Sequence, residues 1–175
     1  MVEKKRFFDI DLEVLDISIP LFAMRVEELE NKVVNYDLTK FLKGKNCEAR
    51  FLLKKKDDKI MGEMFSFKVH PSFIRRMIGH SISIVEDSFV VKSQDKDMRI
   101  KPFLITRKRV HRSVRNALRK ECRKIIEKFV SEDTSDKIFR AVVSSVLQRS
   151  LSKKLKKIYP LAVCELRVVE LVKKR

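Results

Sequence analysis

Residues 107–128 read RKRVHRSVRNALRKECRKIIEK and hold ten Lys or Arg against two acids, Glu121 and Glu127. Apolar side chains recur here every three or four positions, at Val110, Val114, Leu118, Cys122, Ile125 and, just beyond, Phe129. That period predicts a helix over about residues 110–131 with its apolar side facing a core. A row of arginines has the same period and is offset by about a quarter turn, at roughly 100° per residue: Arg112, Arg115, Arg119 and Arg123.

This arginine row has two interpretations. A charged surface helix normally carries acids four residues from its bases, and here only two acids accompany ten bases. Like charges then repel one another along the helix unless a polyanion lies against it. Arg presents a fixed fork of donors that fits phosphate oxygens, and it stays ionised at any working pH. The pattern therefore favours contact with a polyanion over a merely solvated face.

The same imbalance extends over the whole chain. Its 175 residues include 41 Lys or Arg and 24 Asp or Glu, a net charge of +17 with a pI near 10.0. Residues 1–40 carry a net charge of −3 and residues 41–175 one of +20. Nucleic acid is the commonest partner of such a charge on a small folded domain, ahead of an anionic membrane or an acidic protein. We expect the acidic opening to face solvent, a protein neighbour or the domain's own basic surface.

The residues before the helix alternate with period two, as strands do. Strands are predicted over residues 10–19 (ending at Pro20), 32–37, 47–54 and 59–70, the last two joined by a turn at Asp57-Asp58. Residues 21–29 fit either a strand or a short helix. A short helix is predicted over residues 72–78, between Pro71 and Gly79, followed by a second hairpin from residues 81–93 and 98–106.

A second helix is predicted after the basic one, from the cap residues Asp133, Thr134 and Ser135 to Pro160. Lysines close it at positions 153, 154, 156 and 157, where a helix C-terminus favours cations, so they rank below the arginine row as RNA ligands. Residues 163–172 alternate as a last strand. The predicted fold class is α+β: a small barrel-like β-sheet of several hairpins, two long C-terminal helices packed on it, and a final strand. Residues 1–175 are expected to form one domain, with residues 1–20 as a candidate N-terminal arm.

Nothing in the sequence indicates a catalytic, metal or cofactor site. His70, His80 and His111 lack metal-binding spacing, and the three glycines form no phosphate loop. Three distant cysteines favour buried thiols of a reducing compartment over disulfides or zinc. No apolar run approaches the roughly 18 residues of a membrane span, and the basic helix lacks the aromatic rim of a membrane-surface helix. We expect a soluble cytoplasmic protein that is not an enzyme and takes no cofactor or small-molecule substrate.

A second basic group lies at the N-terminus, where Lys4, Lys5 and Arg6 precede Phe7 and Phe8. Two interpretations stay open. The group is an arm on RNA whose rings stack on bases, or the two rings pack under the first strand. The predicted RNA-binding residues are Arg107, Lys108, Arg109, Arg112, Arg115, Arg119, Lys120, Arg123, Lys4, Lys5 and Arg6.

From Asp87 onward the chain resembles a known family. TRKR at residues 106–109 ends a strand pair, a helix with repeated Arg follows, and IYPL at residues 158–161 precedes a strand with basic and valine residues. This ordered set resembles the archaeal and eukaryotic small-subunit ribosomal protein family eS-one, also written S-three-Ae. KKRFFDI at residues 4–10 and VVNYDLTKFL at residues 33–42 are weaker likenesses. The chain departs from the family in having LENK at residues 29–32, where glycines are frequent, and in lacking the long eukaryotic C-terminal extension.

The resemblance implies a compact, archaeal-type member of that family. Such a protein would sit on the platform of the small ribosomal subunit near the mRNA exit, in contact with small-subunit rRNA and neighbouring ribosomal proteins. Its role would be architectural, because Arg and Lys neutralise crowded phosphates and fix local RNA shape. The alternative is a free RNA-binding module or translation-associated factor. That alternative predicts aromatic rings exposed on a sheet, whereas the twelve Phe mostly occupy alternating, core-like positions.

Overall fold

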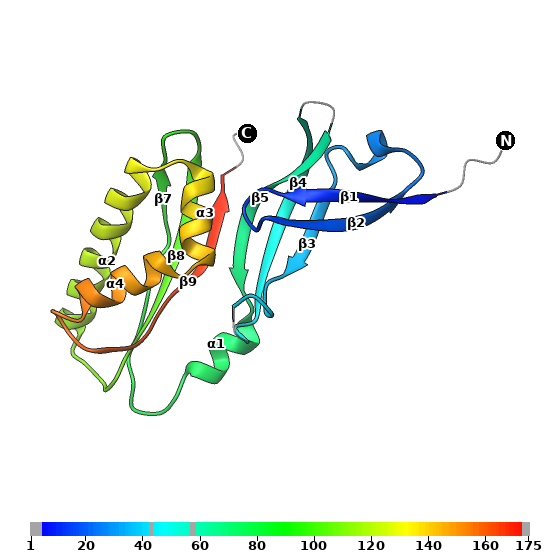
Figure 1. Ribbon diagram of the computed structural model, residues 1–175. Helices are drawn as coiled ribbons and strands as arrows, with labels where there is room; N and C mark the ends of the chain where they lie inside the picture. The colour runs from blue at the N-terminus through cyan, green and yellow to red at the C-terminus, as the bar shows by residue number, and fades with distance from the viewer. Residues whose placement is uncertain (1–4, 43, 57–58, 173–175) are drawn as a thin grey trace.

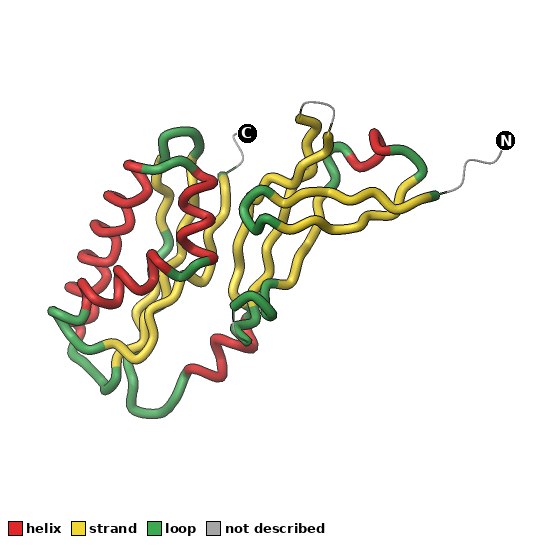
Figure 2. The backbone as a smooth tube through the Cα atoms, in the orientation of Figure 1, coloured by secondary structure: helices red, strands yellow, loops and turns green. Residues whose placement is uncertain are grey.

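Nine strands form one sheet in the computed structural model, and three of the helices cover one side of its C-terminal part (Figures 1 and 2). The structure describes residues 5–42, 44–56 and 59–172. The strands are β1 (Arg6–Leu12), β2 (Ile17–Ala23), β3 (Val33–Asp37), β4 (Cys47–Lys56), β5 (Lys59–Val69), β6 (Ile84–Glu86), β7 (Phe89–Lys92), β8 (Asp97–Thr106) and β9 (Leu161–Leu171). The helices are the short 3-10 helix η1 (Val26–Leu29), α1 (Pro71–Met77), α2 (Arg112–Glu132), α3 (Ser135–Val143) and α4 (Val146–Leu155).

The sheet has two lobes that meet along a short ladder (Figure 1). We call residues 1–69, with β1 to β5, the strand lobe, and residues 70–175, with the remaining elements, the helical lobe. β5 joins the two lobes. It pairs with β4 and β1 of the strand lobe, and its residues 66–68 pair with residues 168–170 of β9 in the helical lobe. The sheet path ends at β2 and β6, so the sheet does not close. The predicted α+β class is confirmed, with an open sheet in place of a barrel.

One buried core continues through both lobes. Phe51 and Met64 of the strand lobe belong to the same cluster as Phe103 of β8 and Phe139 of α3. A smaller cluster lies between the β1–β2 hairpin and the strands beside it, formed by Ile10, Ala23, Leu29, Leu53 and Ile60. β1 crosses β5 closely at Gly62, where a Cβ atom would overlap the Leu12 side chain. The lobes therefore share their apolar interior, although their surfaces differ.

The single strand predicted over residues 10–19 is wrong, because these residues belong to a hairpin. β1 and β2 pair antiparallel, from Arg6 opposite Ala23 to Leu12 opposite Ile17. The chain reverses before Asp16, which has a φ of 53° and donates its N–H to the Leu12 carbonyl at 3.0 Å. Pro20 lies inside β2 instead of ending it. β2 is at the sheet edge, where one side of a strand needs no backbone donors.

The strand predicted over residues 81–93 is divided into β6 and β7. β8 pairs with β6 at residues 103–105 and with β7 at residues 97–100, so Pro102 falls between the two ladders. The register of β8 with β9 also shifts between Lys101 and Pro102. Proline has no N–H to donate to a ladder. The break in β6–β7 therefore lies where β8 lacks a backbone donor.

The basic helix predicted from the sequence is confirmed as α2, with a small rotation of its buried side. Its buried residues are Leu118, Cys122, Ile126 and Val130. Ile125 and Phe129, which the pattern places on the buried stripe, are only partly buried. In the second half of α2, each buried residue is therefore one position later than the sequence pattern indicates: Ile126 in place of Ile125, and Val130 in place of Phe129.

The prediction of one long second helix is wrong, because α3 and α4 are separate helices. Ser145 between them is left-handed, with a φ of 57°. The Ser144 hydroxyl donates to the Arg140 carbonyl at 2.7 Å, and the Gln148 side-chain amide donates to the Val142 carbonyl at 2.9 Å. The Arg140 carbonyl also accepts the Ser144 N–H at 2.9 Å, as it would in a continued helix, whereas the Val142 carbonyl is paired with the Ser145 N–H at 3.1 Å and the Gln148 amide in place of the N–H of residue 146. The bend brings α4 across α2 and onto β9.

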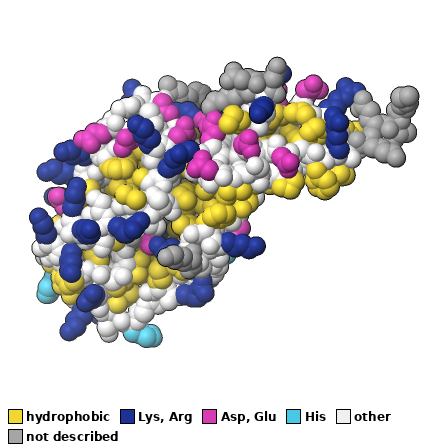
Figure 3. All heavy atoms as spheres, in the orientation of Figure 1, with side chains coloured by type: hydrophobic (Ala, Val, Ile, Leu, Met, Phe, Trp, Pro, Cys, Tyr) yellow, Lys and Arg dark blue, Asp and Glu magenta, His cyan; other side chains and the backbone are white. Residues whose placement is uncertain are grey.

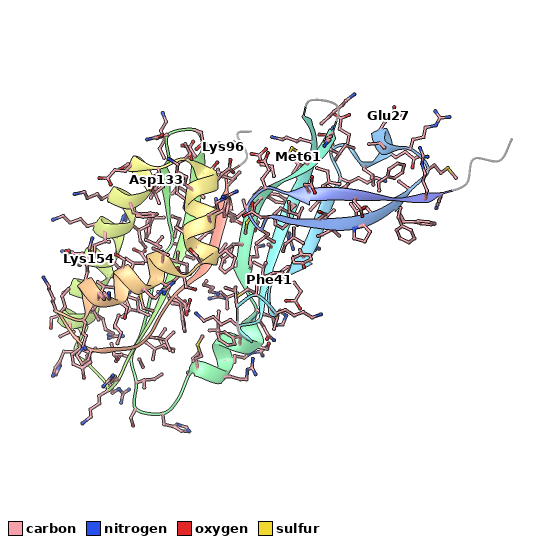
Figure 4. All side chains as sticks on the ribbon, viewed as in Figure 1. Glu27, Phe41, Met61, Lys96, Asp133 and Lys154 are labelled. Carbon is pink, nitrogen blue, oxygen red and sulfur yellow. The ribbon has the colours of Figure 1, made fainter. Side chains whose placement is uncertain are left out.

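α3 begins at a carboxylate from a distant turn. Thr134 is its N-cap residue but makes no side-chain cap bond. Asp95, in the β7–β8 turn, accepts instead from the Ser135 N–H at 2.9 Å and from the Ser135 hydroxyl at 2.5 Å. Burial raises the pKa of Asp95, but hydrogen bonds from Ser135 and Ser93 outweigh it and hold that pKa below its ordinary value. Lys96 of this turn and Asp133 of the α2–α3 connection lie at the same end of the helical lobe (Figure 4).

Candidate nucleic-acid interface

The loop before α2, residues 107–111, is held by two buried hydroxyls. The Thr106 hydroxyl donates to the Lys108 carbonyl at 2.7 Å and accepts the Ser83 N–H at 3.0 Å. The Ser83 hydroxyl accepts the Val110 N–H at 3.1 Å. Thr106 has no exposed surface and Ser83 only 7%. This anchorage fixes the backbone of the loop while leaving the side chains of residues 107–109 exposed.

Arg112 and Arg115 extend this group onto the first turn of α2. Both side chains are exposed. Within the described part of the chain, neither side chain has a hydrogen bond or an ion pair. They lie at the N-terminal end of a 21-residue helix, where the backbone N–H groups add a partial positive charge. These two arginines are therefore available to an external anion.

The second half of the arginine row is engaged in contacts with other residues of the protein. Arg119 Nε donates to the Glu86 carbonyl of β6 at 3.1 Å. Arg123 Nε donates to Glu127 at 2.8 Å, and its guanidinium lies 5.0 Å from the Phe89 ring centre of β7. The hydrogen bond to Glu127 raises the pKa of Arg123. The structure thus divides a row that looks uniform in the sequence, and it uses the later arginines to hold α2 against the sheet edge.

Lysines at the end of α4 lie beside the loop before α2. The Arg107 N–H donates to the Pro160 carbonyl at 3.3 Å, which places the segment after α4 next to that loop. Lys156 and Lys157 in this segment are exposed. In the sequence, a helix C-terminus is a sufficient local reason for the α4 lysines. The bend at Ser145 brings them beside the loop before α2. We name this surface the basic end: Arg107, Lys108, Arg109, Arg112, Arg115, Lys156 and Lys157.

A further lysine group lies on the other flank of α2. Lys124 and Lys128 of α2 and Lys154 of α4 line a shallow groove between the two helices. Lys154 lies on the outer side of the helical lobe (Figure 4). Lys120 of α2 is also exposed. Glu121 and Glu132 also line this groove, so its charge is mixed, although Figure 3 shows Lys and Arg side chains crowded over the lobe as a whole.

The N-terminal basic group is divided differently. Lys4 lies outside the described residues. Lys5 and Arg6 are exposed; Lys5 lies 6.0 Å from the Phe22 ring centre and the Arg6 guanidinium 5.0 Å from that of Phe8. Phe8 packs against the smaller core cluster, whereas Phe7 is 70% exposed. Packing under the strand therefore fits Phe8, and an exposed ring available for stacking fits Phe7. Lys5 and Arg6 are separated from the basic end by the length of the sheet (Figure 1).

His70 and the three cysteines have structural environments, whereas His80 and His111 are exposed. His70 caps α1, accepting the Ser72 N–H at 3.4 Å. Burial raises the pKa of Cys47 and Cys122 to about 12 and also raises that of Cys164, so these thiols stay protonated at neutral pH. Over residues 5–42, 44–56 and 59–172, no cluster of three His, Cys, Asp or Glu could hold a metal ion. In that same part of the chain, no helix combines the length and apolar character needed to cross a membrane.

Comparison with known proteins agrees with the resemblance seen in the sequence. The model of the Ribosomal S3Ae family matches residues 21–175, which include the whole helical lobe. A relative from Nanoarchaeum equitans, the small ribosomal subunit protein eS1, is 28% identical over 99 residues. That match covers 56% of this chain and 50% of the relative, so the chain spans about half the length of the curated relative that it matches. With the family model covering most of its length, this chain belongs to the Ribosomal S3Ae family.

Proposed function

We propose that this protein is a structural constituent of the small ribosomal subunit and that its basic end binds small-subunit rRNA. Family membership, the name of the relative and the net charge of +17 support this role. One observation carries the proposal: seven exposed cations gather at one end of the helical lobe, and none is in an ion pair with another described residue. By the family resemblance, the site of action is the platform near the mRNA exit, on ribosomes in the cytoplasm.

The basic end binds RNA through phosphate oxygens. Arg107 and Arg109 are presented by a loop whose backbone is already fixed at Thr106 and Ser83, so little conformational freedom is lost on binding. Arg112 and Arg115 add planar donor forks, and the N-terminus of α2 adds its partial positive charge. Such contacts read the shape of a folded backbone and not its base sequence. The protein therefore acts by fixing RNA geometry, together with neighbouring ribosomal proteins.

The strength of this contact depends on salt. Each phosphate that the basic end neutralises releases counterions, so the logarithm of the affinity falls by about 0.7–0.9 per phosphate for each tenfold rise in salt. Arg119 and Arg123 contribute less to this slope, because their guanidinium groups already have partners on β6, β7 and α2.

Co-sedimentation with small subunits tests the proposal. The variant Arg109→Glu/Arg112→Glu/Arg115→Glu reverses three charges of the basic end. The control Lys32→Glu/Lys59→Glu/Lys92→Glu reverses three exposed lysines elsewhere. Both variants should keep the wild-type circular dichroism spectrum and melting temperature, since all six side chains are exposed. The basic-end variant should be lost from the subunit fraction, and the control should remain in it.

The same experiment separates the alternative functions. Co-sedimentation of the basic-end variant at the wild-type level would contradict the proposed anchor. A wild-type chain that binds RNA oligonucleotides but never enters the subunit fraction would instead be a free RNA-binding module.

A further inference from the structure

The outer face of the β1–β2 hairpin combines aromatic rings with carboxylates. Alternation along the two strands places Phe7, Asp9 and Asp11 of β1 on this face, opposite Phe22, Pro20 and Ser18 of β2. All six residues are exposed. Phe7 and Phe22 are 70% and 56% exposed, and their ring centres lie 4.9 Å apart. The opposite side of the hairpin packs on the smaller core cluster, so this face is the free one.

The charge of this face is opposite to that of the basic end. The carboxylates of Asp9 and Asp11 make no ion pair or hydrogen bond with another described residue. They follow the ring pair along β1 at two-residue steps of about 7 Å. A phosphate backbone on this face would meet two uncompensated negative charges. In Figure 3, hydrophobic and acidic side chains share the surface over the hairpin, with Lys and Arg at its far end, while Lys and Arg crowd the helical lobe.

The rings already accept a cation. Lys5 Nζ lies 6.0 Å from the Phe22 ring centre, within the range of a cation–π contact. Arg is a better occupant than Lys at such a site, because its planar guanidinium stacks on rings and is more weakly hydrated. An external arginine can therefore replace Lys5 on the Phe7–Phe22 pair while a second cation pairs with Asp9 or Asp11.

Addition of a strand to the edge of β2 does not explain this surface. β2 lies at the edge of the sheet and contains Pro20, which has no N–H to donate. Proline is one of the residues with which natural edge strands prevent further pairing. The occupant must therefore bind across the face, through side chains.

We propose that the outer face of the β1–β2 hairpin binds an arginine- and lysine-rich protein segment in extended conformation. One arginine stacks on Phe7 and Phe22, and cations at alternate positions of the segment pair with Asp9 and Asp11. The two-residue repeat of this face matches the side-chain repeat of an extended peptide. The inference goes beyond the proposed RNA contact, because the hairpin and the basic end lie at different ends of the molecule and carry opposite charge (Figure 1).

Fluorescence anisotropy with two probes tests this inference on the full chain. One probe is a labelled peptide of alternating Arg and Ser, and the other is a single-stranded RNA oligonucleotide of mixed sequence. The variants are Phe7→Ala/Phe22→Ala and Asp9→Asn/Asp11→Asn. The control Glu30→Gln/Glu132→Gln removes the same charge at exposed acids outside this face. A peptide with Lys in place of Arg measures the stacking contribution.

Each hairpin variant should weaken peptide binding by about fivefold or more, and the control should leave it unchanged. The Lys peptide should bind the wild-type chain more weakly than the Arg peptide, and this difference should disappear in Phe7→Ala/Phe22→Ala. RNA binding should be unaffected by the ring substitutions. The variant Arg109→Glu/Arg112→Glu/Arg115→Glu should lose RNA binding but keep peptide binding. If this variant still binds RNA, the RNA proposal fails, while the peptide measurements still test the hairpin proposal.

Two outcomes would overturn the inference. Equal peptide binding by the wild-type chain and both hairpin variants would show that the peptide binds elsewhere. Weaker RNA binding by Phe7→Ala/Phe22→Ala with unchanged peptide binding would show that the rings stack on nucleobases. Because the substituted side chains are exposed, a melting temperature equal to that of the wild-type chain should accompany every variant.

Discussion

The two lobes of this protein share one core but differ in charge. The helical lobe, residues 70–175, has 27 Lys or Arg and 11 Asp or Glu, a net charge of +16. The strand lobe, residues 1–69, has 14 and 13, a net charge of +1. A net charge of this size does not help a chain to fold, because like charges repel in the compact state. The difference agrees with the proposal that the helical lobe binds a polyanion and that the hairpin of the strand lobe binds a partner of another kind.

The junction between the lobes is made of backbone and charge together. β5 pairs with β9, and Lys45 of the strand lobe lies 2.5 Å from Glu165 of β9. Arg140 of α3 donates to the Glu13 carbonyl at 2.5 Å, next to the turn of the β1–β2 hairpin. These contacts join the lobes at three places, in addition to the shared core. We therefore expect the lobes to unfold together, as the single-domain interpretation of the sequence predicts.

The largest expected effect comes from emptying the shared core in either lobe. Phe51→Ala in the strand lobe and Phe139→Ala in the helical lobe should each lower the free energy of unfolding by about 3–5 kcal/mol, because both rings are completely buried. Urea unfolding followed by far-ultraviolet circular dichroism and by calorimetry should show one transition for each variant. Two transitions, with only one of them moved by each substitution, would divide the protein into independent domains.

A smaller effect compares one capping carboxylate in each lobe. Asp95 binds Ser135 across the fold, whereas Asp37 binds its neighbour Thr39, whose N–H donates to it at 2.8 Å. Asp95→Asn should lower the free energy of unfolding by about 1 kcal/mol at neutral pH, as the loss of a helix cap does. Asp37→Asn should have less effect, because that carboxylate is fully exposed and its bonds are local.

The contribution of Asp95 should also depend on pH in a defined direction. Its pKa is lowered in the folded protein, so the unfolded chain takes up the proton first as the pH falls. The stabilisation is complete above the unfolded pKa of about 4 and is lost as the pH falls through the folded pKa. Urea unfolding of wild type and Asp95→Asn should therefore converge at low pH. A difference that stays constant from neutral to acidic pH would contradict the role of the charged carboxylate.

The smallest expected change in stability is that of Arg115→Gln, which is compared with Arg119→Gln on the same helix. Arg115→Gln should leave the free energy of unfolding within about 0.5 kcal/mol of wild type, because its side chain has no partner among the described residues. It should weaken RNA binding and reduce the salt slope by about one phosphate. Arg119→Gln should lower the free energy of unfolding by about 1 kcal/mol, through loss of the bond to the Glu86 carbonyl. Equal stability and equal RNA affinity of the two variants would remove the distinction within the arginine row.

Periodicity in the sequence predicts most elements but not how they are divided. α2, the β4–β5 hairpin and the last strand were predictable because each depends on a local repeat of apolar residues. The missed breaks at Asp16 and Ser145 lie at left-handed residues, which the period of apolar residues does not reveal. The missed break between β6 and β7 depends on a residue of a neighbouring strand. Pro102 lies in β8, yet its consequence is the gap between β6 and β7. The residues of the basic end in α2 and in the loop before it were predictable from the sequence. The contribution of Lys156 and Lys157 after α4 was not.

The sequence by itself determined the cationic excess, the family likeness and the period that makes α2 amphipathic, because all three are properties of residues near one another in the chain. Only the tertiary structure decided which arginines are free. Arg119 and Arg123 reach β6 and β7, about thirty residues earlier in the chain, and Asp95 caps α3 from a turn forty residues away. Such pairings depend on how strands and helices stack, and no local pattern of a single sequence specifies them.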